Sequence, residues 1–139
     1  MKKIVVGIDD SPNARAALRW ALDHGGADAE IVAVHAWHLP VMGGFEMTLT
    51  DPAPFEAGAE KLLADVVADV TQGAAERDRV RTVVTAGASA EVILAEAADA
   101  DLVVVGARGH GGFTGLLLGS VTNAVVHHAP CPTVVVPVP

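Results

Sequence analysis

The residues with the clearest chemical potential lie in a glycine-rich segment that spans positions 106–119. Six of the chain's 14 glycines fall there, at positions 106, 109, 111, 112, 115 and 119. Glycine lets backbone N–H groups approach a ligand closely, and Ser120 and Thr122 follow at the start of an expected helix. The amides and dipole of a helix N-terminus favour an anion, so the pattern predicts a phosphate cradle. A surface loop with turn glycines is the alternative explanation.

The spacing separates this segment from two common phosphate-binding loops. No Gly-Lys pair occurs, which excludes the Walker pattern, and the only lysine beyond the N-terminus is Lys61. The dinucleotide fingerprint is missing as well, because its third glycine would fall on Thr114. The spacing that is present is G-x2-G-x9-G-S, which is formed by Gly106, Gly109, Gly119 and Ser120.

A second cluster, Asp9-Asp10, follows the first apolar run of the chain. Carboxylate oxygens suit Mg²⁺, so we expect Asp9 to contact a ligand or metal, while Asp10 or Ser11 caps the next helix. A receiver domain also carries an acidic pair here, but it needs an Asp after the third strand and a Lys after the fifth. The third strand runs into Thr85-Ala86-Gly87 and the fifth into Pro137-Val138-Pro139, so that class is excluded.

The remaining reactive side chains carry weaker signals. Arg108 is suited either to pair with phosphate or to face solvent. The histidine spacings match no zinc pattern, and Cys131 is the only cysteine, so an intrachain disulfide is impossible. Ser120 has neither a nucleophile-elbow motif nor an ordered Asp/His partner, so no catalytic residue is predicted.

The elements that must position these residues alternate between apolar strands and helical patterns. Strands separated by helices pair in parallel, and wholly apolar strands lie in a sheet that is covered on both faces. We therefore predict one domain over residues 1–139 with an α/β fold, a three-layer α/β/α sandwich around an open, doubly wound, five-stranded parallel sheet. In such sheets ligands bind outside the carboxyl ends of the strands, where Asp9 and Gly106 fall. Strands are expected at 3–8, 31–37, 80–85, 102–105 and 133–136, and helices at 12–24, at 57–70, from a cap at Ser89 onward, and at 120–128.

Composition excludes several classes of function. The 139 residues are 51% hydrophobic, and nine Lys and Arg against 17 Asp and Glu give a formal net charge of −8. Such a chain does not attract nucleic acid or an anionic membrane by long-range charge. No window approaches the ~18 apolar residues of a membrane span, and the N-terminus has no signal-peptide core. We expect a cytoplasmic protein whose carboxylates all lie in residues 1–101, so the predicted cradle carries none.

Several motifs, in order and on the expected elements, resemble the universal stress protein family along essentially the whole chain. The opening Val-Gly-Ile-Asp-Asp-Ser, the block from Asp101 to Gly111, the Leu118-Gly-Ser-Val-Thr stretch and the Ala129-Pro-Cys-Pro-Thr-Val-Val-Val ending carry the resemblance. The glycine spacing is similar to that of the ATP-binding branch. Asp10 is a departure, since many members have Gly there.

The resemblance implies a site for ATP or another adenine nucleotide, with Mg²⁺ near Asp9. It also implies a homodimer formed through the C-terminal strand, Thr133–Val138, which would otherwise expose an apolar edge. The 38–56 loop is suited to act as a flap or a partner surface. The implied nucleotide-binding residues are Gly7, Ile8, Asp9, Ala36, Gly106, Ala107, Arg108, Gly109, His110, Gly111, Gly119, Ser120, Val121 and Thr122.

The function expected from these features is a nucleotide-dependent sensor or regulator in stress response rather than an enzyme. A weak ATPase or phosphotransferase is one alternative, although the chain offers no clear general base or Walker lysine. An interaction module that does not use nucleotide is the other.

Overall fold

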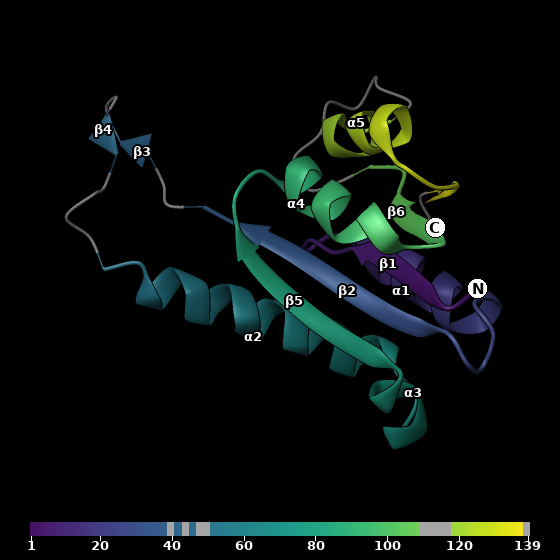
Figure 1. The fold of residues 1–139 in the computed structure, drawn as a ribbon. Coiled ribbons are helices and arrows are strands. Elements are labelled where there is room, and N and C mark those ends of the chain that lie inside the picture. Colours follow the sequence, from purple (N-terminus) through teal and green to yellow (C-terminus); the bar gives the residue numbers. More distant parts are fainter. Residues whose placement is uncertain (39–40, 43–44, 47–50, 109–117, 138–139) are drawn as a thin grey trace.

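A computed structural model describes residues 1–38, 41–42, 45–46, 51–108 and 118–137, and within it a five-stranded sheet forms the centre of the molecule (Figure 1). The strand order is β5-β2-β1-β6-β7, and all four pairings are parallel. The strands are β1 (Lys3–Gly7), β2 (Glu30–Trp37), β5 (Val80–Ala86), β6 (Leu102–Gly106) and β7 (Thr133–Val136). The predicted sheet is therefore confirmed.

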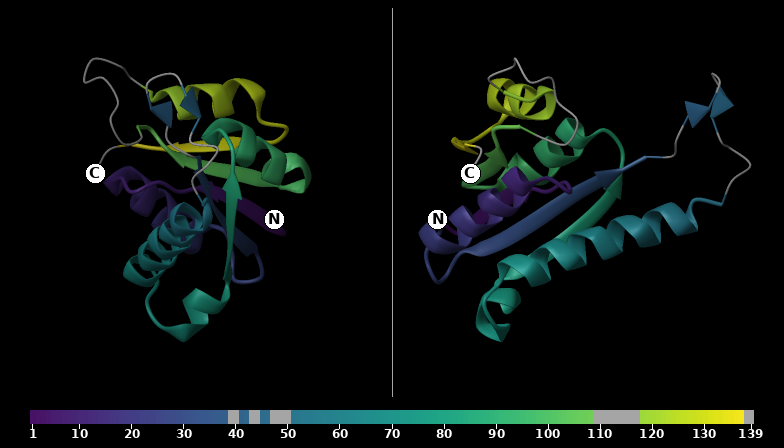
Figure 2. Two further views of the ribbon diagram at one scale, coloured as in Figure 1. Left: turned by 90° about the vertical axis from the view of Figure 1, so that its left-hand side faces the viewer. Right: turned by 180° about the vertical axis from the view of Figure 1, so that it is seen from behind.

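Helices cover both faces of this sheet, as predicted for a three-layer sandwich (Figures 1 and 2). Helix α1 (Pro12–His24) packs on β1, β6 and β7, and α2 (Ala53–Val70) packs on β2 and β5. On the other face, α4 (Ser89–Glu96) packs on β1 and β2, and α5 (Ser120–His128) packs on α4 and β7. A short α3 (Ala74–Asp78) precedes β5, and a 3₁₀ turn, η1 (Ala97–Asp99), follows α4.

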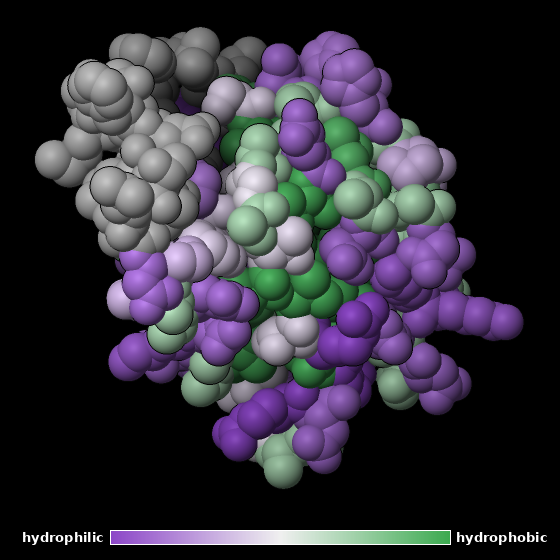
Figure 3. Space-filling view, turned by 60° about the vertical axis from the view of Figure 1, so that its left-hand side comes forward, coloured by the Kyte–Doolittle hydropathy of each residue, from purple (hydrophilic) through white to green (hydrophobic). Residues whose placement is uncertain are grey.

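Side chains alternate between two apolar cores because successive residues of a strand point to opposite faces. Val6, Ala33 and Val104 belong to the core under α1 and α2, whereas Val5, Val34 and Val103 belong to the core under α4. Strand β6 is buried at every position, as expected for a continuous apolar strand in a covered sheet. In the view of Figure 3, hydrophobic residues form a strip bordered by hydrophilic side chains.

Besides α3 and η1, which the sequence analysis did not predict, three features differ from the expected elements. The 38–56 segment contains a two-stranded antiparallel pair, β3 (Val41–Met42) and β4 (Phe45–Glu46), which projects beyond the sheet (Figure 2). Helix α2 begins at Ala53 rather than at position 57, because a helix tolerates proline in its first turn and Pro54 occupies that position. Ser89 is the first helical residue of α4 rather than its cap, which is Ala88.

Within the described residues, no helix is long and apolar enough to cross a membrane.

Candidate functional site

A pocket of about 310 Å³ lies where the carboxyl ends of β1 and β6 meet. These neighbouring strands are the point where the sheet's winding changes direction, since β1 continues through α1 to β2 on one side and β6 continues to β7 on the other. Open parallel sheets bind ligands at this position. The β1/β6 pocket, as we call it, is lined by Gly7, Ile8, Asp9, Ser11, Ala14, Ser89, Ile93, Val105, Gly106, Arg108, Gly119, Ser120, Val121 and Thr122.

The turn between β1 and α1 forms one wall. The Ile8 N–H donates to the Val34 carbonyl at 2.8 Å, which ties the turn to β2. Asp9 Oδ1 accepts the Ser11 N–H at 2.8 Å, and Ser11 Oγ accepts the Ala14 N–H at 3.1 Å. Ser11 is thus the N-cap of α1, as predicted, and the Asp9 carboxylate is held at the pocket.

Gly7 lines the pocket, and its lack of a side chain lets Ile93 and Val105 approach the end of β1 closely. A Cβ atom at this position would lie 2.7 Å from Ile93 Cδ1 and 3.3 Å from Val105 Cγ1. Contacts this short force neighbouring side chains to move. The glycine that ends β1 therefore admits the Ile93 side chain of α4 against the strand.

The end of β6 is fixed by bonds from α5 and β7. The Thr122 hydroxyl donates to the Gly106 carbonyl at 2.6 Å, and both residues are buried. The Ala107 N–H donates to the Val136 carbonyl at 2.7 Å, and the Ala107 carbonyl accepts the Gly119 N–H at 2.8 Å. These bonds bring the two ends of the glycine-rich segment together at the pocket.

Two helix N-termini without side-chain caps border the pocket. Gly119 is the N-cap of α5 and Ala88 that of α4, and neither position supplies a side-chain acceptor to the first turn. Ser120, Val121 and Ser89 from these first turns line the pocket. First-turn amides lack partners within their own helix, and the helix dipole makes this end positive. The pocket therefore favours a ligand with anionic or hydrogen-bond-accepting oxygens.

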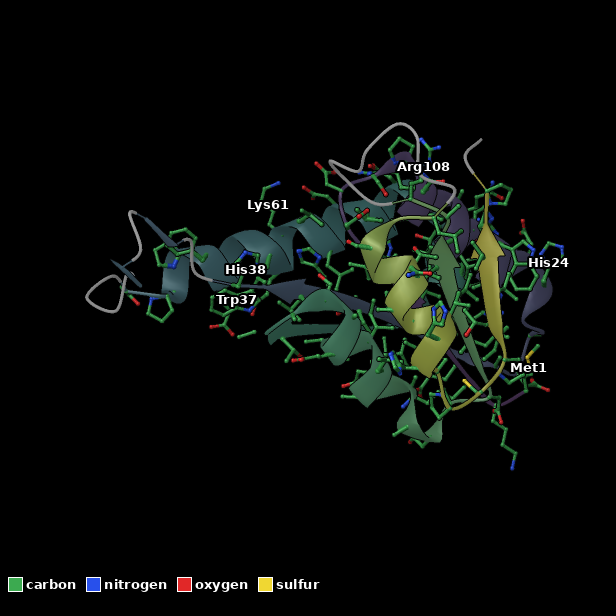
Figure 4. All side chains as sticks on the ribbon, turned by 90° about the horizontal axis from the view of Figure 1, so that it is seen from above. Met1, His24, Trp37, His38, Lys61 and Arg108 are labelled. Atoms are coloured by element: carbon green, nitrogen blue, oxygen red, sulfur yellow. The ribbon has the colours of Figure 1, made fainter. Side chains whose placement is uncertain are left out.

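The charged side chains of the β1/β6 pocket balance each other. Among its described lining residues, Asp9 is the only acid and Arg108 the only base. Arg108 follows β6, whereas Lys61 projects from α2 (Figure 4). Lys61 lines a separate groove of about 530 Å³ between α1 and α2, together with Asp10 and Arg15. Asp10, which pairs with Arg15 at 3.5 Å, therefore belongs to that groove and not to the pocket.

The structure brings together many of the residues that the sequence selected. Gly7, Ile8, Asp9, Gly106, Arg108, Gly119, Ser120, Val121 and Thr122 line the pocket. Ala36 and Ala107 do not, since Ala36 lies on β2 and Ala107 is buried between β7 and Gly119. Gly109, His110 and Gly111 lie outside the described residues.

Five lining residues were not selected for this site. Ser11 and Ser89 were expected only as helix caps. Their position at the start of a helix that follows a strand could have indicated that they line the pocket. The other three are apolar, and nothing in their type distinguishes a pocket wall from a core. They are Ala14, Ile93 and Val105.

The sheet and pocket define a doubly wound α/β domain with an anion-favouring site at its switch point. The Universal stress protein family matches residues 1–137, and the chain belongs to that family. The universal stress protein Rv2005c of Mycobacterium tuberculosis is 38% identical over 134 residues, which cover 95% of this chain and 44% of the relative. The chain thus spans less than half the length of this relative.

Solved structures agree with the fold. UspA from Lactobacillus plantarum gives a TM-score of 0.78 at 26% identity, with 97% of both chains covered. The universal stress protein from Archaeoglobus fulgidus in complex with dAMP gives a TM-score of 0.63 at 22% identity, again with 97% of both chains covered.

Proposed function

We propose that the chain binds an adenine nucleotide in the β1/β6 pocket and acts as a nucleotide-dependent sensor or regulator in stress response. The observation that carries this proposal is the uncapped first turn of α5 beside the Asp9 turn and the end of β6. An N-terminal helical turn binds phosphate through its free amides. The relative from Archaeoglobus fulgidus, solved with dAMP, supports adenine as the base.

ATP is the nucleotide that the glycine spacing favours, and Asp9 would help to hold a Mg²⁺ ion that neutralises its phosphate charge. The described residues contain no group of three or more His, Cys, Asp or Glu side chains suited to hold a metal. Among the described residues that line the pocket, Asp9 alone supplies a carboxylate, and its Oδ1 accepts the Ser11 N–H. That arrangement fits Mg²⁺, which is commonly bound by one or two carboxylates together with substrate phosphates.

The test is isothermal titration calorimetry with AMP, ATP and ATP plus Mg²⁺, combined with the Val121→Glu variant. Val121 lines the pocket at the start of α5, so a carboxylate there repels phosphate and weakens binding by at least about tenfold. Val126→Glu is the matched control, because both valines are exposed on α5, at 37% and 43%, and Val126 does not line the pocket. Equal affinity in both variants, or no binding by the native chain at millimolar nucleotide, contradicts the proposal.

A weak ATPase is the second candidate, and the Asp9 carboxylate at the pocket is the observation that favours it. Phosphate release above background that Asp9→Ala abolishes would establish turnover. If the native chain binds ATP and releases no phosphate, the sensor function stands.

We also propose that the chain forms a homodimer through β7. This strand is at one edge of the sheet, and Val134 and Val135 are partly exposed on it. An apolar edge strand carries unpaired backbone groups that a second copy would satisfy.

A further inference from the structure

His35 contacts the pocket turn from outside the pocket. The ring lies on β2, and its Nδ1 is 2.8 Å from the Ile8 carbonyl. A carbonyl oxygen only accepts, so Nδ1 carries the hydrogen. The Ile8 N–H donates to the Val34 carbonyl at 2.8 Å. Val34 and His35, which are consecutive residues of β2, therefore bond to the N–H and the carbonyl of Ile8.

Two other histidines make the same kind of bond within a single helix. His24 Nδ1 is 3.0 Å from the Trp20 carbonyl, and His127 Nδ1 is 2.7 Å from the Asn123 carbonyl. Each is one helical turn from its acceptor on an exposed surface. The His35 bond, in contrast, is partly buried and links residues 27 positions apart.

His35 acts on the pocket without lining it. Ala33 belongs to the core under α1 and α2, and Val34 to the core under α4. His35 therefore shares the face of Ala33, because side chains alternate along a strand. Ile8 and Asp9 do line the pocket.

We infer that His35 is a positioning residue of the β1/β6 pocket, holding the Ile8–Asp9 peptide plane in the orientation that the ligand meets. The Ile8 carbonyl and the Asp9 N–H belong to one rigid, planar group. Fixing the carbonyl therefore fixes the direction of the Asp9 N–H and the position of the Asp9 Cα atom, to which the side chain is attached. This inference rests on the proposed nucleotide site.

Three substitutions test it in the full chain. Asn places an amide N–H at the same number of bonds from Cβ as Nδ1, Gln places it one bond further, and Leu removes the donor. Calorimetry with AMP is expected to show affinity within about twofold of native for His35→Asn and about three- to tenfold weaker binding for His35→Leu and His35→Gln. His24→Leu removes the same type of bond within α1, at a residue that does not line the pocket. This variant is expected to bind as the native chain does.

Several outcomes separate this inference from the proposed function. If the native chain binds no adenine nucleotide, the proposed function fails first. If it binds and His35→Gln binds equally well, the positioning role is overturned. Because His35→Leu carries a risk of misfolding, the Asn and Gln variants, both polar, decide the result. Nitrogen NMR of neutral His35 is expected to show the hydrogen on Nδ1, and a dominant Nε2–H form would also contradict the inference.

Discussion

At the scale of single residues, the Thr122 hydroxyl has a role other than the phosphate contact that the family resemblance implies. It donates its hydrogen to the Gly106 carbonyl at 2.6 Å in a buried position. A phosphate oxygen requires a donor, and this hydroxyl has given its only hydrogen to the protein. Thr122 is therefore able to offer a phosphate its backbone N–H, while its side chain fixes the end of β6.

This role predicts the stability of two variants. Thr122→Val keeps the shape and leaves the Gly106 carbonyl without its donor, so we expect a loss of about 1–3 kcal/mol in the free energy of unfolding. Thr122→Ser retains the hydroxyl and loses one methyl group, which costs ~1 kcal/mol or less. Urea denaturation monitored by circular dichroism measures both values. A Val variant as stable as the native chain would show that the bond contributes nothing.

Gly106 gives a second prediction at this scale. A Cβ atom on it would lie 2.5 Å from Asn13 Cβ, 2.9 Å from Asn13 C and 3.0 Å from Asn13 O. Since most of these atoms are backbone of α1, Gly106→Ala forces the helix away from β6. We expect a loss of about 1–3 kcal/mol in the free energy of unfolding by urea denaturation.

Gly58→Ala is the control for this substitution. Gly58 lies in α2 with nothing within 4 Å of an added Cβ atom. Alanine is the better helix former there by about 0.5–1 kcal/mol, so this variant is expected to gain stability. Similar losses in both alanine variants would argue against close packing at Gly106.

The sequence predicted a glycine requirement at position 106, but the structural reason for that requirement is different. Its position in the spacing motif indicated room for a ligand, whereas the structure shows the glycine closely approached by the backbone of Asn13. Asn13 itself, 6% exposed, carries no motif that marks it. A contact between β6 and α1 depends on how distant segments pack, and a local pattern does not record that.

At the scale of elements, Arg19 joins three helices on the face away from α4. Its guanidinium donates to both carboxylate oxygens of Glu76 in α3, at 2.9 and 2.6 Å. It also donates to the Val70 carbonyl at the end of α2 and to Asp23 in its own helix, at 3.0 and 2.7 Å. This fork geometry is the strong form of an Arg–carboxylate pair.

The Arg19–Glu76 pair predicts an acid-sensitive stability. The guanidinium of Arg19, with the Gln72 N–H, lowers the pKa of Glu76 from 4.5 to about 2. A lowered folded-state pKa gives stability that is full above the unfolded-state value and is lost as the pH falls. We therefore expect the contribution of Glu76 to disappear between about pH 4.5 and 2.

Thermal melting at several pH values tests this contribution. Glu76→Gln is expected to lower the melting temperature by a few degrees at pH 7 and to converge with the native chain as the pH falls below about 2, because the native carboxylate is half protonated near pH 2 and protonates fully below it. Glu60→Gln, on the exposed surface of α2, is the control and should leave the melting curve unchanged. A constant difference between Glu76→Gln and native at all pH values would contradict the assignment.

The sequence predicted the sheet well and the irregular elements poorly. Runs such as Leu102–Gly106 are apolar throughout, and this pattern is typical of a strand buried on both faces. The β3 and β4 strands are two residues each, too short for any periodicity to appear. Prolines 52 and 54 were interpreted as loop residues, although the structure places them at the N-cap and in the first turn of α2.

At the scale of the whole molecule, the residues without acids, 102–139, include β6, α5 and β7 at one end of the sheet. Strands β6 and β7 are neighbours at one end of the sheet, and α5 packs against β7 (Figure 1). The 17 carboxylates lie in residues 1–101, which include α2, α3 and β5 toward the other end. Neither β7 nor α5 contains an acid, so these elements add no like-charge repulsion of their own when two copies of a chain with net charge −8 meet at β7.

The backbone of β7 shows how to test that association without breaking the sheet. The Pro132 and Val136 carbonyls accept bonds from Val103 and Ala107 of the β6 side. Because backbone groups alternate in direction along a strand, the Val135 N–H points away from β6. Val135→Pro therefore removes an outward donor and keeps the β6 ladder, and proline is tolerated at such edge positions.

Sedimentation velocity is expected to give twice the chain mass of 14.2 kDa for the native protein and a single chain mass for Val135→Pro. Thr82→Pro is the matched control on the opposite edge. The Arg79 carbonyl of the β5 side accepts the Ile31 N–H, so by the same alternation the Thr82 N–H points outward from β5. A dimer that survives Val135→Pro and dissociates with Thr82→Pro would place the interface on β5, at the opposite edge of the sheet. A native chain that remains monomeric at high concentration would remove the homodimer altogether.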